Sequence, residues 1–138
     1  MTFGEKVRAA RTSRNWTQDQ LCEVAGVSKR ALINYETKGI LPKSRDTYYK
    51  LAEALGMDAE VLLDDDAEFV IKAAETYGNR GAQQALQLVE QITGLYAGGE
   101  LEEDDMDAMM KAIQDAYWIA KKKNKRHTNK RYLVKEEQ

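Results

Sequence analysis

The amino-acid sequence predicts an all-α protein, with five short helices in its first half and about three helices in its second half. Three observations predict this class. Apolar residues recur at the three- and four-residue spacing of a helix face, and no segment shows the sustained alternation of a half-buried strand. The 138 residues contain one proline, Pro42. Residues that favour helix starts and helix ends separate the apolar stripes.

The first two helices are predicted by an apolar face and by capping signals. Residues 3–11 carry apolar side chains at helical spacing. Thr17 and Gln20, three residues apart, have the pattern of a capping box, in which each side chain bonds the backbone N–H of the other residue. Gly26 follows the apolar residues of this second segment and favours a helix end.

The third, fourth and fifth helices are predicted by their N-cap residues. Ser28 can accept a hydrogen bond from the first turn of a helix that runs to about Glu36. Ser44 has the same position before residues 45–55, whose apolar side chains form one stripe. Asp58 can cap a short fifth helix that ends near residue 63.

Three further helices are predicted in residues 64–138. Apolar stripes run through residues 67–77, 81–97 and 104–123, and glycines stand between them. Gly78 is expected to end the first of these helices. The last ten or so residues are polar, and we expect them to fray.

A run of three aspartates after residue 63 predicts a domain boundary. Residues 1–63 hold 10 Lys/Arg and 8 Asp/Glu, a net charge of +2, whereas residues 64–138 hold 11 and 15, a net charge of −4. The whole chain has a net charge of −2, unlike a non-specific nucleic-acid binder. We therefore expect a DNA-binding domain in residues 1–63 and a helical domain with a basic tail in residues 64–138.

The composition argues against several other classes of protein. The one cysteine, Cys22, allows no internal disulfide, and together with His127 it suggests no metal or cofactor site. No apolar run is long enough to span a membrane or to act as a signal peptide, so a cytoplasmic protein is expected. The sequence shows no paired carboxylates, no nucleophile with a base and no phosphate-binding loop, so we do not expect an enzyme.

The second and third helices have the spacing of a helix-turn-helix, with Gly26 in the turn. Leu21, Val27 and Leu32 would form the apolar contact between the two helices, and Cys22 would be a small buried residue beside it. Residues 3–63 resemble the DNA-binding domain of the lambda-type phage repressor and Cro family, also called the XRE family. The matching segments are "TQxxL" from Thr17, "AGVS" from Ala25, "NYE" from Asn34, Pro42, and "KLAEALG" from Lys50. The resemblance implies a five-helix bundle whose third helix enters the major groove of DNA.

Two cations at the start of the third helix support this interpretation. Lys29 and Arg30 follow Ser28, where each cation opposes the helix dipole at a cost of roughly 0.3–1 kcal/mol. A phosphate or a guanine edge facing them would offset that cost, while Asn34 suits adenine and an outward Ile33 suits a thymine methyl group. The predicted DNA-binding residues are Gln18, Ser28, Lys29, Arg30, Ile33, Asn34, Thr37, Lys38 and Lys43.

The resemblance also implies roles for residues outside the third helix. Gln18 matches a glutamine that bonds a DNA phosphate in family members. Arg11 and Glu36 match a pair that links the first helix to the third, and we interpret this pair as structural. The loop that holds Lys38 and Lys43 is about one residue longer than the commonest family loop.

The predicted function is a sequence-specific DNA-binding transcriptional regulator, a repressor that binds an inverted-repeat operator as a homodimer through residues 64–138. Two alternatives stay open. The chain is also compatible with the antitoxin of a toxin–antitoxin pair, or with a regulator whose second half responds to a small ligand or to a protease. The methionine-rich stripe of residues 104–123 is interpreted as core, and basic residues through Arg131 as an additional source of phosphate contacts.

Overall fold

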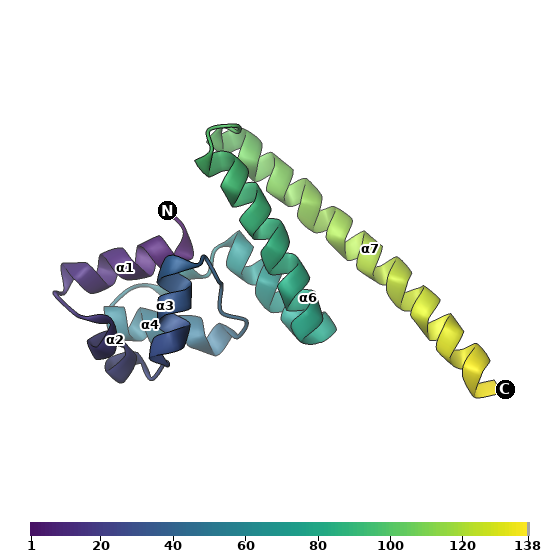
Figure 1. Ribbon diagram of the computed structural model, residues 1–138, viewed down its shortest axis with the longest axis horizontal. Coiled ribbons are helices and arrows are strands. Elements are labelled where there is room, and N and C mark those ends of the chain that lie inside the picture. Colours follow the sequence, from purple (N-terminus) through teal and green to yellow (C-terminus); the bar gives the residue numbers. More distant parts are fainter. Residues whose placement is uncertain (138) are drawn as a thin grey trace. The chain divides into compact units, whose positions relative to one another are not determined.

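The computed structural model describes the backbone of residues 1–137, and the side chains of these residues except Tyr96 and residues 125–137. The described chain is entirely helical, as predicted, with no strand in residues 1–137 (Figure 1). The helices are α1 (Phe3–Ser13), α2 (Gln18–Ala25), α3 (Lys29–Thr37), α4 (Arg45–Leu55), α5 (Ala59–Leu62), α6 (Asp65–Ala97) and α7 (Glu103–Glu137). No described helix has both the length and the apolar character needed to cross a membrane.

The first five helices form a small bundle around a shared apolar core. Helices α1 and α2 each pack against α3 and α4, and α5 packs against α4. Leu21 and Leu32, two of the three residues predicted to join α2 to α3, are fully buried, while Val27 is half-buried. The fully buried side chains of this bundle include Val7, Leu21, Leu32, Tyr48, Leu51 and Leu62.

The helix ends agree with most of the predicted capping signals. The backbone N–H of Gln20 donates to Thr17 Oγ1 at 3.2 Å, and the N–H of Thr17 donates to Gln20 Oε1 at 2.7 Å. Ser28 Oγ accepts from the N–H of Ala31 at 3.1 Å. Ser44 is the N-cap residue of α4, as expected, but its side chain makes no capping hydrogen bond. A serine at the N-cap position therefore did not by itself predict the bond.

Helices α1 and α3 approach each other closely at Gly4. A Cβ added to Gly4 would overlap the backbone carbonyl oxygen of Tyr35 and would lie 3.2 Å from the Cα of Glu36. The ring of Phe3 packs edge-on against Tyr35, with 5.6 Å between the ring centroids. Gly4 therefore allows the backbone of α1 to contact the backbone of α3.

Helix α6 contains the break that Gly78 predicts. Gly78 has φ of 73° and ψ of −162°, which is a conformation open essentially only to glycine. The predicted helices over residues 67–77 and 81–97 are the two segments of α6 on either side of this residue. Helix α7 continues to Glu137, through the polar residues that were expected to fray. Residues 100–138 contain no glycine or proline that would end it earlier.

The chain divides into two compact units, residues 1–90 and residues 91–138. Contacts from α1 and α4 hold the start of α6 in the first unit. Lys6 Nζ lies 3.5 Å from Oδ2 of Asp64, the residue before α6, and Arg45 makes a bidentate pair with Glu68. The buried residues of α6 nearest this end are Ala67, Phe69, Val70, Ile71 and Ala73. The predicted boundary after residue 63 stays a prediction, and the first unit extends beyond it.

In the second unit, Ile92, Met110 and Tyr117 are buried, and the Tyr117 and Trp118 rings pack edge-on. Met109 and Ile119, on α7, are exposed. The methionine-rich stripe is therefore core at Met110 and surface at Met109. Of the basic residues through Arg131 suggested for phosphate contacts, Lys122 and Lys123 are exposed and Lys121 is half-buried, while the side chains from residue 125 on lie outside those described.

Candidate nucleic-acid interface

Helices α2 and α3 form a helix-turn-helix whose turn depends on Gly26. Gly26 has φ of 72°, in the left-handed region that glycine adopts without strain, and its N–H donates to the carbonyl of Cys22 at 2.9 Å. Two residues later Ser28 caps α3. The turn therefore ends α2 and begins α3 within three residues, which fixes one helix against the other.

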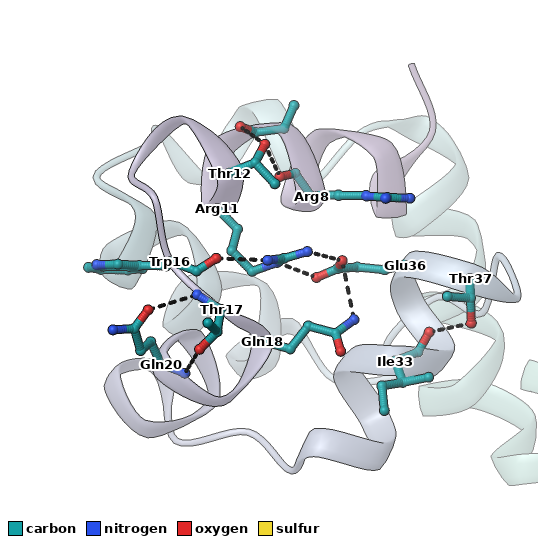
Figure 2. A network of polar contacts seen from close by, with 11 residues as sticks. Arg8, Arg11, Thr12, Trp16, Thr17, Gln18, Gln20, Ile33, Glu36 and Thr37 are labelled. Atoms are coloured by element: carbon teal, nitrogen blue, oxygen red, sulfur yellow. Dashed lines mark hydrogen bonds and ion pairs between the residues drawn. The ribbon is translucent and has the colours of Figure 1, made fainter.

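The predicted outward face of α3 is only partly exposed. Lys29, Arg30 and Thr37 are exposed, whereas Ile33 and Asn34 are half-buried. Thr37 Oγ1 donates to the carbonyl of Ile33 at 2.6 Å, so this hydroxyl is held against its own helix (Figure 2). The exposed cations of this face thus stand at the start of α3, and the residues suited to contact bases follow them.

Lys38 and Lys43 are exposed and lie on either side of the loop that joins α3 to α4. A buried hydrogen bond shapes this loop, because the Tyr48 hydroxyl donates to the carbonyl of Pro42 at 3.0 Å. Burial raises the pKa of Tyr48, so this hydroxyl keeps its proton. The bond fixes the backbone immediately before Lys43.

Arg11 and Glu36 form the pair that the sequence suggested. Arg11 Nε donates to Glu36 Oε2 at 3.0 Å, and Nη2 donates to Oε1 at 2.8 Å. The third guanidinium nitrogen, Nη1, donates to the carbonyl of Trp16 at 2.7 Å, just before α2 begins. The side chain of Glu36 is 2% exposed and that of Arg11 is 11% exposed. One largely buried guanidinium therefore ties together α1, α3 and the residue before the N-cap of α2.

Gln18 belongs to the same network, as Figure 2 shows. Its Nε2 atom lies 3.5 Å from Glu36 Oε1, at the long limit for a hydrogen bond. The side chain is half-buried and points toward Glu36. Its predicted bond to a DNA phosphate stays a prediction.

The structure adds an ion pair between the helices that the sequence analysis missed. Lys29 Nζ lies 3.1 Å from Asp19 Oδ1, and the two side chains are 55% and 72% exposed. Asp19 is in the first turn of α2, and Lys29 begins α3. The sequence shows the opposite charges at these two helix starts, but it does not predict that the two side chains contact each other.

Cys22 is half-buried beside these charges. Burial raises the pKa of its thiol, Asp19 and Glu36 raise it further, and Lys29 lowers it. A raised pKa leaves less thiolate at neutral pH, so this thiol is a weak nucleophile. Cys22 was predicted to be buried, and the structure leaves it half-buried. Among the described residues, no group of three or more His, Cys, Asp or Glu side chains could hold a metal ion.

Two comparisons with known proteins agree with this geometry. Residues 4–65 match the sequence family described as a helix-turn-helix domain. The immunity repressor protein of Bacillus phage phi105 is 27% identical over 140 residues, which cover 96% of this chain and 96% of that protein. No solved structure matches the chain significantly.

Proposed function

We propose that this chain, whose residues 4–65 are a helix-turn-helix domain, is a sequence-specific transcriptional repressor that binds DNA as a homodimer. The single observation that carries the proposal is the α2–turn–α3 unit, which is held rigidly by the buried Arg11–Glu36 pair and begins α3 with two exposed cations. Similarity to a phage immunity repressor over nearly the whole chain supports repression as the outcome. Such a protein acts with its DNA in the cytoplasm.

In the proposed complex, α3 lies in the major groove. Arg30 would donate to a guanine edge, Asn34 would make a bidentate contact with an adenine, and Ile33 would contact a thymine methyl group. Phosphate contacts would come from residues at the ends of the helices and in the loop before α4. These phosphate-contacting residues are Gln18, Ser28, Lys29, Thr37, Lys38 and Lys43.

Dimerisation would supply the selectivity that one module lacks. A single helix-turn-helix contacts only a few base pairs, and two modules related by a two-fold axis recognise two half-sites. We place the dimer contact in residues 64–138, where Met109 and Ile119 are exposed apolar side chains. Occupation of an inverted-repeat operator would then exclude competing proteins from the promoter.

Selection of bound duplexes from a random DNA pool tests this proposal directly. We expect the full-length chain to enrich an inverted repeat whose half-site centres lie about one helical turn apart. Enrichment of a single half-site would contradict the dimer, and the absence of any enriched sequence would contradict sequence-specific binding.

Substitutions in α3 and α2 should separate base recognition from phosphate binding. We expect Asn34→Ala to remove about 1–3 kcal/mol of discrimination at one base position of the enriched site. Gln18→Ala should weaken binding to all duplexes alike, because phosphates carry no sequence information. Titration of the enriched duplex and of its single-base variants measures both effects. Unchanged affinity of Asn34→Ala for the enriched site would show that α3 is oriented differently.

A fragment of residues 1–90 tests the role of the second half. This fragment is the first compact unit and retains the buried residues at the start of α6. We expect it to fold, to sediment as a monomer and to lose most of its operator affinity, because one module binds DNA weakly. A dimeric fragment would limit the dimer contact to residues 1–90. Full operator affinity of the fragment would leave residues 91–138 for a toxin, a protease or a small ligand.

A further inference from the structure

The ion pair between Asp19 and Lys29 lies where the proposed DNA-binding surface begins. Its atoms are 3.1 Å apart and both side chains are mostly exposed, so the pair is open to solvent and to a polyanion. Asp19 directly follows Gln18, and Lys29 directly follows Ser28. Both neighbours are predicted phosphate contacts. The Asp19 carboxylate therefore lies at a place where cations and neutral hydrogen-bond donors would strengthen DNA binding and a negative charge would weaken it.

The helix dipoles have opposite effects on the two charges of this pair. An acidic residue in the first turn of α2 is favourable by itself, whereas a cation in the first turn of α3 is unfavourable. Asp19 offsets the unfavourable position of Lys29, and the pair has no net charge. In the free protein, Lys29 therefore already has a counter-ion, and a DNA phosphate has to compete with Asp19 for it.

Non-specific binding to DNA depends on such unpaired cations. Each phosphate that a protein cation neutralises contributes to the salt dependence of binding. A lysine held by a carboxylate contributes less, and the carboxylate itself repels a neighbouring phosphate. Contacts with base edges are less affected, because the proposed base contacts come from Arg30, Ile33 and Asn34, which lie outside this pair.

We propose that Asp19 determines specificity: by pairing with Lys29 it withholds this charge from DNA phosphates and lowers the affinity for non-specific DNA. This inference rests on the proposed DNA-binding function and deepens it. Asp19 acts through Lys29 and through repulsion of phosphate, so it raises the ratio of specific to non-specific affinity.

The test compares full-length variants on a short duplex of random sequence over a range of salt concentrations. Asp19→Asn keeps the shape of the side chain and removes its charge. We expect this variant to bind more tightly at low salt, and to steepen the plot of log affinity against log salt concentration by about 0.9, the value for one additional phosphate neutralised. The double variant Asp19→Asn/Lys29→Gln should lose this additional slope.

Asp46→Asn is the matched control. Asp46 pairs with Lys50 at 3.2 Å within α4, and these side chains are 70% and 50% exposed, close to the values for Asp19 and Lys29. Both variants change the net charge by the same amount, and neither should change the melting temperature, since exposed pairs contribute little to stability. An unchanged slope for Asp19→Asn, or an equal change for Asp46→Asn, would overturn the inference.

Measurements on the sequence enriched from the random pool complete the test. Asp19→Asn should lower the ratio of affinity for the enriched duplex to affinity for the random duplex. If the wild-type chain enriches no sequence, the proposed function itself fails. If it enriches a site and Asp19→Asn leaves the affinity ratio and the salt slope unchanged, only the role of Asp19 fails.

Discussion

Replacement of Gly4 by alanine should destabilise the DNA-binding unit by about 3 kcal/mol or more, at or above the usual upper limit for an added methyl group in a packed site. The added Cβ would overlap the Tyr35 carbonyl oxygen and would lie 3.0 Å from the carbonyl carbon. Both are backbone atoms of α3, so rotation of a side chain cannot relieve the contact. Helices α1 and α3 would have to separate, and the buried Phe3 and Val7 would lose part of their packing.

Thermal unfolding followed by circular dichroism measures this effect. A loss of this size corresponds to a drop of more than about 10 °C in the melting temperature of a small domain. Gly94→Ala is the control, because Gly94 lies in α6 with nothing within 4 Å of the added Cβ. That substitution should be neutral or stabilise by up to about 1 kcal/mol. An unchanged melting temperature for Gly4→Ala would mean that α1 and α3 lie farther apart.

Replacement of Arg11 by alanine should cost about 3–5 kcal/mol, because it leaves a buried carboxylate without its cation. The side chain of Glu36 is 2% exposed, and after the substitution its one remaining described partner is Gln18 Nε2 at 3.5 Å. The carbonyl of Trp16 also loses its donor. We expect lower stability in urea unfolding, while the discrimination between bases by any folded protein is retained.

Arg45→Ala is the matched control for this prediction. Arg45 also makes a bidentate pair, with Glu68, but those side chains are 40% and 42% exposed. An exposed pair contributes about 0–1 kcal/mol, so Arg45→Ala should change the urea midpoint little. Adding Glu36→Gln to Arg11→Ala should recover part of the loss, because it removes the buried charge. If Arg11→Ala keeps its midpoint and weakens binding to all DNA, Arg11 is a phosphate contact instead.

Local signals explain why most helix starts and ends could be predicted from the sequence. The capping box of Thr17 and the cap of Ser28 involve residues at most three positions apart, and the structure forms both. Gly78 likewise marked the break in α6 by residue type alone. Fraying of the last ten or so residues was expected because they are polar, and it stays a prediction; the sequence there has no glycine or proline that would end the helix.

Contacts between helices could be predicted only where a family resemblance supplied them. The Arg11–Glu36 pair links residues 25 positions apart and was expected from the resemblance alone. The close approach at Gly4 and the Asp19–Lys29 pair had no such guide, because a glycine in a helix and two opposite charges ten residues apart have many possible arrangements. The first unit continues into α6 as far as residue 90. The sequence did not predict this extent, because it also depends on contacts between helices.

The break at Gly78 makes the direction of the following chain depend on two torsion angles of one residue. Unbroken, the 33 residues of α6 would form a rod about 50 Å long, whereas the chain changes direction within it (Figure 1). Apart from its chain neighbours and its own helix, no atom would lie within 4 Å of a Cβ at this position, so the positive φ, and not lack of space, is what excludes other residues here. Only glycine among the encoded amino acids readily adopts these angles. A missense change in this one codon would therefore redirect the chain without altering any residue proposed to contact DNA.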